Sequence, residues 1–238
     1  KKNENEIVCS ADAYLLSVKG LANHIPKGKP YLVANGSYSV EPDRNISFAD
    51  GKIHCVYAGT FDATKGGAAA AAAAAAFLPE NYHVHILGFG TDKQKRELLK
   101  QIEILQQQCN CTLTYDGLLS GDEYISFLQK CQIGLCTQIP DAKYTETSFP
   151  SKVLVYMANG LHVLSPQIKA VEESNVGDLI HYYDKQTPEC IANAIKKIDL
   201  QEPYDSRTRL QKLDKRLVLD LQNLLKGQYD DAPLSNSQ

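Results

Sequence analysis

One short stretch of this 238-residue chain carries residues suited to binding an anion. In residues 148–160, Ser148 can cap a helix through its hydroxyl, and Pro150 fits the first turn, where a missing N–H group costs nothing. The remaining N–H groups and the positive end of the helix dipole would then point outward, beside the mobile charge of Lys152. These residues predict a phosphate-binding helix end, and they fit an ordinary amphipathic helix equally well.

The same helix has two expected faces. Its buried stripe is expected at Val153, Leu154, Met157 and Ala158. The rotation of about 100° per residue then places Lys152, Val155 and Tyr156 together on an accessible face. A valine between a lysine and a tyrosine is unusual for a solvated surface and suits the wall of a cleft.

A second loop, residues 57–67, also suits phosphates. Gly59 permits close backbone approach, Thr60 and Thr64 supply hydroxyl groups, and Lys65 stands just before the next helical segment. The loop lacks the Gly-Lys-Ser/Thr spacing of a P-loop. We therefore expect a diphosphate contact of another kind.

Two further loops could surround a nucleotide base. The first contains Gly88, Phe89 and Gly90, and the second contains Gly117, Leu118 and Leu119. Backbone beside a glycine could hydrogen-bond a base edge while the leucines pack against the ring. A tight turn for the first loop and an ordinary surface loop for the second are the alternative interpretations.

The elements that must position these loops alternate along the chain. Short β-rich runs span residues 53–58, 83–87, 112–115, 133–136, 162–165 and 179–183. Helix-length segments lie between them, which predicts an α/β fold with a doubly wound, Rossmann-like parallel sheet. Ligands of such sheets bind at the carboxyl ends of the strands, where all of the loops described above would meet.

Helices are expected at residues 66–77, 92–107 and 205–226, and from Ser120 onward. The first is rich in alanine and could approach a sheet closely, with a low-complexity spacer as the alternative. Thr91 is expected to cap the helix at residues 92–107. Ser120 and Glu123 are expected to form a capping box for the helix that starts at Ser120. The leucines of residues 205–226 need a partner surface, and the tail from about residue 227 is expected to be disordered.

Composition excludes several classes of protein. The formal net charge is −3, from 25 basic and 28 acidic residues without a basic block, so nucleic acid is not an expected partner. The longest apolar run is too short to span a bilayer. Seven cysteines without a regular framework fit a reducing cytosol. We interpret Cys109, Cys111, His83, His85 and His162 as structural residues, and we expect no metal site.

At this point the sequence resembles the C-terminal, nucleotide-sugar-binding domain of group 1, family 4-like glycosyltransferases, which have the two-domain GT-B fold. The resemblance covers roughly residues 30–200. It depends on residues 57–60 with 65–67, on residues 85–90, and on residues 148–160 followed by 162–165. The order and spacing of these motifs are specific, although each motif alone is not.

The resemblance implies a donor site without a cofactor or metal. Its diphosphate contacts would be Gly59, Thr60, Lys65, Ser148, Phe149, Pro150, Ser151 and Lys152. Its nucleoside contacts would be Gly88, Phe89, Gly90, Gly117, Leu118, Leu119 and Val155. No catalytic residue is assigned.

Two departures from the family pattern affect this site. The family commonly has an arginine where this chain has Thr60, and a pair of glutamates where it has Thr147 and Val155. Glu146 is adjacent to the first of these positions, and no residue replaces the second. Because the second glutamate usually holds the ribose of the donor, Val155 puts donor affinity or the usual binding pose in doubt.

By the same resemblance, residues 1–40 are the remnant of, or linker from, an N-terminal acceptor domain. Residues 41–200 are the nucleotide-sugar-binding domain, and residues 201–238 are a C-terminal helix and tail. The expected function is sugar transfer with retention from a nucleoside-diphosphate sugar to a glycan or lipid-linked acceptor, of hexosyltransferase type, with the isolated fragment inactive.

Polysaccharide biosynthesis in the cytoplasm is the expected setting, with peripheral membrane association of the full-length protein at the inner face as a further option. A non-catalytic nucleotide-binding or assembly module is the alternative function. A sugar epimerase is disfavoured, because its characteristic histidine and carboxylate loops are not apparent.

Overall fold

Six parallel strands form the central sheet of the computed structural model, which describes residues 8–62, 64–140 and 147–228. The strands are β3 (Ile53–Thr60), β4 (Tyr82–Phe89), β5 (Thr112–Gly117), β6 (Ile133–Leu135), β7 (His162–Pro166) and β8 (Ile180–Tyr183). Their order in space is β5-β4-β3-β6-β7-β8. The predicted parallel sheet and all six predicted strands are confirmed.

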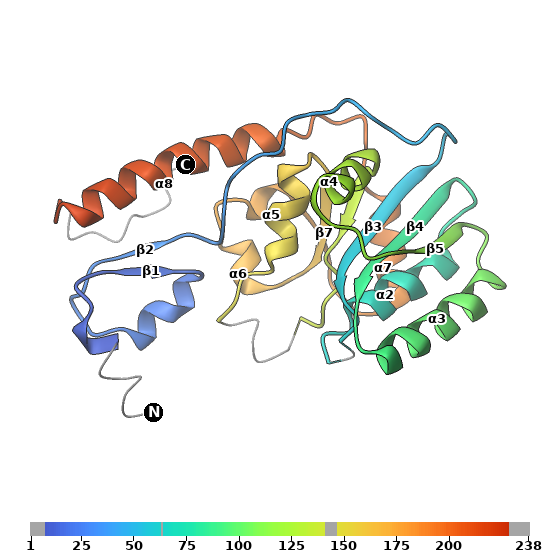
Figure 1. Cartoon of the computed structure of the whole chain (residues 1–238), viewed down its shortest axis with the longest axis horizontal. Coiled ribbons are helices and arrows are strands. Elements are labelled where there is room, and N and C mark those ends of the chain that lie inside the picture. Colours follow the sequence, from blue (N-terminus) through green and yellow to red (C-terminus); the bar gives the residue numbers. More distant parts are fainter. Residues whose placement is uncertain (1–7, 63, 141–146, 229–238) are drawn as a thin grey trace.

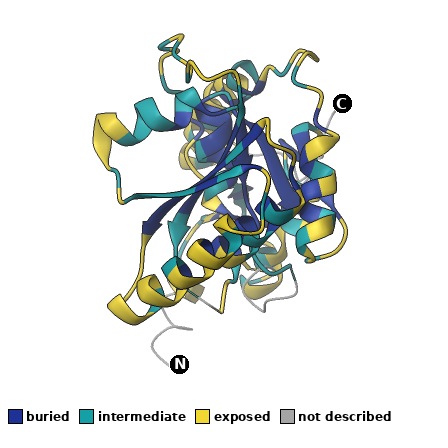
Figure 2. Ribbon diagram, turned by 90° about the vertical axis from the view of Figure 1, so that its right-hand side faces the viewer, coloured by how far each residue is buried: buried dark blue, intermediate teal, exposed yellow. Residues whose placement is uncertain are grey.

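Helices cover both faces of this sheet (Figure 1). One face carries α2 (Gly67–Ala74) with its continuation η2 (Ala75–Phe77), α3 (Asp92–Gln106) and α7 (Pro188–Lys196). The other face carries α4 (Gly121–Lys130), α5 (Ser151–Ala158) and the short α6 (Lys169–Glu172), and η4 (Gly177–Leu179) leads into β8. Burial follows these layers, since the strands are buried while the outer sides of the helices are exposed (Figure 2). The doubly wound Rossmann-like prediction is confirmed.

The direction of winding reverses between β3 and β6. The chain builds β3, β4 and β5 outward to one side, then returns to place β6 beside β3, with Cys55 paired to Ile133 and Val56 to Gly134. The loops that follow β3 and β6 therefore diverge at the carboxyl edge of the sheet. In open α/β sheets this switch point is where ligands bind.

The alanine-rich segment is a helix because its small side chains allow close packing. Ala71, Ala72 and Ala74 of α2 are fully buried against the sheet. Gly66, at a left-handed φ of 66°, precedes the helix, and the chain leaves it before Pro79. The helix interpretation is confirmed.

The two predicted caps had different outcomes. Thr91 caps α3, as predicted, and it also forms a capping box with Gln94. Ser120 stands at the N-cap of α4 with an extended backbone, but its hydroxyl makes no capping hydrogen bond, so the predicted capping box with Glu123 is wrong. Gly121, the first residue of α4, adopts a positive φ of 54°, which departs from helical geometry directly after Ser120.

The two ends of the described chain meet outside the main sheet. Strands β1 (Tyr14–Leu16) and β2 (Tyr31–Val33), joined through η1 (Lys19–His24), form a separate two-stranded parallel sheet. Helix α8 (Ser206–Leu225), capped by Asp205, packs against β2 and α5 (Figure 1). The long C-terminal helix is confirmed. Residues 229–238 of the predicted tail lie outside the described residues, and the predicted domain boundary at residue 40 stays a prediction.

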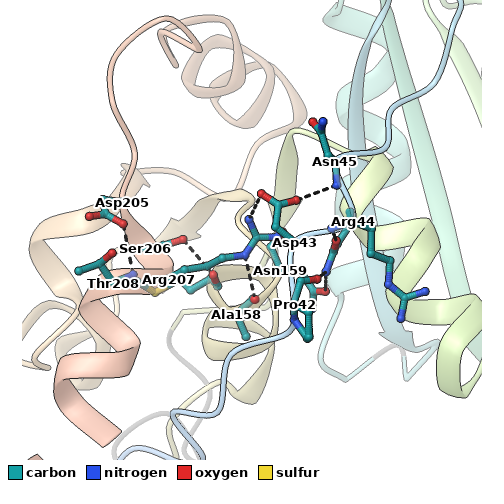
Figure 3. A network of polar contacts seen from close by, with 12 residues as sticks. Pro42, Asp43, Arg44, Asn45, Ala158, Asn159, Asp205, Ser206, Arg207 and Thr208 are labelled. Atoms are coloured by element: carbon teal, nitrogen blue, oxygen red, sulfur yellow. Dashed lines mark hydrogen bonds and ion pairs between the residues drawn. The ribbon is translucent and has the colours of Figure 1, made fainter. Parts of the chain in front are cut away.

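Arg207 ties α8 to the rest of the molecule (Figure 3). Its guanidinium Nη2 donates to the carbonyl oxygen of Asn159 at 2.8 Å, its Nε donates to that of Ala158 at 3.4 Å, and its Nη1 contacts Asp43 at 3.0 Å. These two carbonyl groups lie at the C-terminal end of α5, where the last carbonyl groups of a helix have no N–H partner within the helix. Helix α5, helix α8 and the segment before β3 are thus joined by one side chain.

Within the described residues, no helix is both long and apolar enough to cross a membrane.

Candidate functional site

At the switch point, the floor of the candidate site is the backbone of two glycines, Gly59 and Gly88. Gly59 at the end of β3 is paired in register with Gly88 at the end of β4. Gly88 has a φ of 134°, and a side chain there would overlap the carbonyl group of Gly59. The two predicted glycines are therefore brought together, and only glycine at position 88 permits this approach.

Lys152 lies directly over this floor. A Cβ atom added to Gly59 would meet the Lys152 side chain at 2.5 Å from Cε and 2.7 Å from Nζ. The same Nζ lies 5.1 Å from the centre of the Tyr57 ring, a cation–π distance. Burial lowers the pKa of Lys152 below its ordinary value, and the positive charge of Lys65 lowers it further. The charge of Lys152, predicted from one loop, thus lies near enough to interact with that of Lys65, predicted from another.

Lys65 is exposed at the end of the loop that follows β3. Asp62 shapes this loop, because its carboxylate accepts hydrogen bonds from the backbone N–H of Thr64 at 2.9 Å and from its hydroxyl at 2.7 Å. The Lys65 N–H also donates to the Asp62 carbonyl oxygen at 3.0 Å. Thr64 therefore uses its hydroxyl within the loop.

The loop after β6 is fastened to the loop after β3. The Thr137 hydroxyl donates to the Gly67 carbonyl oxygen at 2.7 Å, and the Ile139 N–H donates to the Lys65 carbonyl oxygen at 3.0 Å. Tyr57 reinforces the first loop by donating its hydroxyl to the Thr60 carbonyl oxygen at 3.0 Å. Both sides of the switch point are held by specific hydrogen bonds.

Helix α5 starts later than the sequence predicted. It begins at Ser151, with Pro150 at the N-cap, and Ser148 is exposed before it and makes no capping bond, so the predicted Ser148 cap is wrong. Phe149 precedes a proline, and a residue in that position disfavours helical backbone angles. Residues 148 and 149 therefore stay outside the helix. Of the N–H groups in the first turn of α5, that of Val153 donates to the Pro150 carbonyl oxygen at 3.0 Å.

Tyr156 was predicted on the accessible face of this helix and is instead fully buried. Its ring packs against Gly134 of β6, where any side chain would overlap it, and its hydroxyl oxygen accepts the Ala58 N–H at 2.9 Å. The absence of a side chain at Gly134 lets α5 settle onto the sheet and widens its buried face. Lys152 and Val155 are half-buried, and the four predicted stripe residues are buried, as expected.

The remaining predicted contacts are spread around the site. Phe149 and Pro150 are buried beneath the start of α5, and Ser151 and Thr60 are at least partly accessible. Phe89 and Leu118 are exposed, and Gly90 approaches the side chains of Phe61 and Gln94. Gly117 has a left-handed φ of 85° at the end of β5, and Leu119 lines a separate hollow of about 330 Å³ with Asp116 and Phe127. The hollow contains neither Lys65 nor Lys152.

Sequence reasoning missed residues that support the two lysines. Tyr57 stacks beneath Lys152 and packs against Gly67, and Thr137 joins the loops. Tyr57 stands two residues before Gly59 on the same strand, so a period of two would have placed it on the same face. Thr137 comes two residues after strand β6, and no pattern in the sequence indicates that it would join the loops. Glu146, the nearest substitute for the first family glutamate, lies outside the described residues.

Comparison with solved structures identifies this architecture. A sucrose-phosphate synthase from Thermosynechococcus elongatus matches with a TM-score of 0.63 at 19% identity, covering 94% of this chain and 60% of that one. Anabaena HepE, solved with UDP and glucose, matches with a TM-score of 0.64 at 12% identity, covering 94% and 68%. The chain has the fold of a GT-B glycosyltransferase domain.

A third match shows which part of the GT-B fold this chain contains. The C-terminal domain of a group 1 glycosyl transferase, LpcC from Francisella tularensis, matches with a TM-score of 0.50 at 17% identity. The match covers 79% of this chain and 97% of that domain. The predicted resemblance is thus confirmed for the fold. The chain spans 60% of the length of the matched sucrose-phosphate synthase. No protein-family model and no curated sequence matches the chain.

Proposed function

We propose that this GT-B domain binds the diphosphate of a nucleoside-diphosphate sugar at the switch point between β3 and β6. The observation that carries the proposal is the position of Lys152 over the backbone of Gly59, with the charge of Lys65 near enough to lower the pKa of Lys152. A diphosphate would bring two or more negative charges to these two neighbouring ammonium groups. The half-buried position of Lys152 strengthens such an interaction, because water screens it less than it would on an open surface.

The site suits a reaction in which the diphosphate leaves. As the bond to the sugar breaks, negative charge grows on the diphosphate, and fixed positive charges stabilise that state without reorganisation. The N–H groups in the first turn of α5 add partial positive charge beside Lys152. We propose sugar transfer with retention as the activity of the full-length protein, to a glycan or lipid-linked acceptor bound elsewhere in it.

The nucleoside is proposed to lie against the loops that end β4 and β5. Gly90 and residues 117–119 leave backbone groups accessible for a base, and the uridine nucleotide bound by HepE makes UDP the first ligand to test. Val155 offers no carboxylate for the ribose, so we expect the ribose to be held more weakly than in the usual family pattern.

Direct binding measurements on this chain test the proposal. Isothermal titration with UDP, GDP, ADP and their sugars should give saturable binding for at least one nucleotide. Lys152→Ala and Lys65→Ala should each weaken it about 10- to 100-fold, the loss expected for a hydrogen bond to a charged group. Lys215→Ala removes the same charge from an exposed position on α8 and should leave the affinity unchanged. Absence of binding, or equal effects of all three substitutions, would refute a donor site here.

A second proposal is supported by Thr60 and Val155, which replace the charged residues common in the family. It assigns to the domain a non-catalytic role in nucleotide binding or assembly. If the chain binds a nucleotide, only the full-length protein separates the two proposals. Transfer or hydrolysis of a donor sugar by that protein supports the enzyme, whereas binding without any turnover supports the non-catalytic module.

A further inference from the structure

Three histidines gather on the sheet face covered by α4, apart from the two lysines. His54 lies on β3, and His83 and His85 lie on the neighbouring strand β4. One ring nitrogen from each histidine lies within 4.8 Å of those of the other two. His54 and His85 are almost fully buried, and His83 is half-buried.

Two carboxylates determine where the imidazole protons lie. Asp50 accepts from the Lys52 N–H at 3.1 Å and lies 2.8 Å from Nε2 of His54. Because a carboxylate of an exposed aspartate only accepts, His54 Nε2 must donate. Asp116 likewise accepts the Thr114 hydroxyl at 2.8 Å and lies 3.0 Å from Nδ1 of His85. His85 Nδ1 must therefore donate as well.

This assignment leaves two lone pairs facing each other. The other nitrogens of these two rings, Nδ1 of His54 and Nε2 of His85, are only 2.9 Å apart. A neutral imidazole that donates from one nitrogen has only an acceptor at the other. Two acceptors at this distance repel, so a positively charged species must lie between them. That species is either one extra proton or a metal ion.

His83 favours a metal ion, because one of its ring nitrogens lies within 4.8 Å of a nitrogen of His54 and of His85. Its Nε2 lies 3.0 Å from the hydroxyl of Thr114, and that hydroxyl already donates its hydrogen to Asp116. His83 Nε2 must therefore donate to Thr114, which leaves a lone pair on its Nδ1. One shared proton can join two nitrogens and cannot join three.

We propose that His54, His83 and His85 bind one Zn²⁺ ion. Imidazole nitrogens suit zinc, and Zn–N bonds of about 2.0–2.1 Å in a tetrahedral site place ligand nitrogens about 3.3 Å apart, within the spread of this cluster. Asp50 and Asp116 supply the carboxylate–histidine contacts that typically orient zinc ligands. A shared proton would account for the 2.9 Å contact between His54 and His85, and zinc would account in addition for the nitrogen that His83 brings within 4.8 Å of both.

The surroundings favour a structural zinc site. The ring of Phe48 stacks on His54 at 4.1 Å between centroids, and Phe127 of α4 meets His85 edge-on at 5.1 Å. The hollow lined by Asp116, Phe127 and Lys130 offers an approach from solvent. Zinc would join β3 and β4, with Asp116 of β5 as an outer contact, so its expected effect is on stability.

Zinc titration of the chelator-treated chain, against a chromophoric competitor, tests the proposal. One equivalent should bind and raise the midpoint of thermal unfolding. Co²⁺ should give the visible spectrum of a tetrahedral site with nitrogen ligands. Asp50→Asn, at an exposed side chain, should weaken zinc binding about 10- to 100-fold, the usual cost of losing such an outer contact. His85→Gln should abolish the stoichiometric binding.

A second histidine pair provides the matched control. His162 Nδ1 and His181 Nε2 are 3.1 Å apart without a carboxylate hydrogen bond on either ring among the described residues. His181→Gln should therefore leave zinc affinity unchanged. Circular dichroism must show that each variant is folded, and if His85→Gln is not, Asp50→Asn and the Co²⁺ spectrum decide. Failure of the unmodified chain to bind stoichiometric zinc, unaltered affinity in Asp50→Asn, or a thiolate-type Co²⁺ spectrum would overturn the proposal.

Discussion

Lys152 is half-buried, and its burial determines how its charge responds to pH. Desolvation, followed by the charge of Lys65, lowers its pKa below the ordinary value of 10.5. The folded chain therefore binds fewer protons than the unfolded chain between the lowered pKa and 10.5. Stability gained from this residue is present above 10.5 and is lost as the pH falls through the lowered pKa.

Nucleotide binding should have the opposite pH dependence. A bound diphosphate favours the charged ammonium group, so the affinity should be complete below the lowered pKa of Lys152 and should decline as the pH rises through it. Titration calorimetry with UDP from neutral to alkaline pH measures this decline. Lys152→Met should bind more weakly and lose the part of the dependence that this residue supplies. A profile identical in both chains would show that Lys152 does not contact the diphosphate.

Tyr156 provides a test of the buried contact between α5 and the sheet. Tyr156→Phe removes the hydroxyl oxygen that accepts the N–H of Ala58 and keeps the ring. A buried donor left without a partner costs about 1–3 kcal/mol, so we expect the free energy of unfolding to fall by that amount. Urea unfolding followed by circular dichroism measures it. Tyr31→Phe, at a half-buried tyrosine on β2, should have a smaller effect. Equal losses would contradict the role of the hydrogen bond.

At the scale of elements, close packing of α2 depends on alanine. Ala71 is fully buried between α2 and the sheet, whereas Ala69 on the same helix is exposed. Ala71→Leu should lower the free energy of unfolding by about 1–3 kcal/mol, because extra methylene groups have no space there. Ala69→Leu makes the same chemical change without crowding and should shift it by less than about 0.5 kcal/mol. The denaturant midpoints compare the two, and similar losses would mean that helix propensity, not packing, is being measured.

The sequence predicted elements better than the contacts between them. Strand and helix patterns depend on local periodicity, and Thr91 capped α3 because its partner Gln94 lies three residues away. The burial of Tyr156 depends instead on Gly134 in strand β6, which has no side chain and so leaves space for the ring. A period of 3.6 identifies a helix but not the width of its buried face.

The candidate site shows the same division. The glycines and lysines were predicted because motifs place them in loops of known type, and the structure joins Gly59, Gly88 and Lys152. Ser148 failed as a cap because the restriction that Pro150 places on Phe149 outweighed the preference of serine for the N-cap. The histidine cluster escaped notice because His54 and His85 meet only when β3 and β4 pair in register.

At the scale of the whole molecule, Arg207 holds α8 against α5 (Figure 3). Arg207→Ala leaves the carbonyl groups of Ala158 and Asn159 without this donor, and hydrogen bonds from a charged donor contribute about 1.5–3 kcal/mol. We expect a loss of that size in the free energy of unfolding. Backbone amides of α8 should also exchange hydrogen faster, as mass spectrometry can measure.

Asp43→Ala separates the ion pair from the carbonyl contacts. Asp43 is exposed, and exposed pairs contribute about 0.2–1 kcal/mol. This substitution should therefore cost less than Arg207→Ala and leave amide exchange in α8 nearly unchanged. If the two substitutions were equally damaging, the surface ion pair would be the main attachment of the helix.

The hydrogen bonds from Thr137 and Ile139 have a consequence for kinetics. They hold the described parts of the two loops together before any ligand arrives, so docking a diphosphate there freezes little additional chain. The rate of association should then follow the frequency of productive encounters. Because Lys65 and Lys152 attract a polyanion from a distance, that rate should fall as ionic strength rises. Residence time would depend instead on the short-range contacts made after arrival.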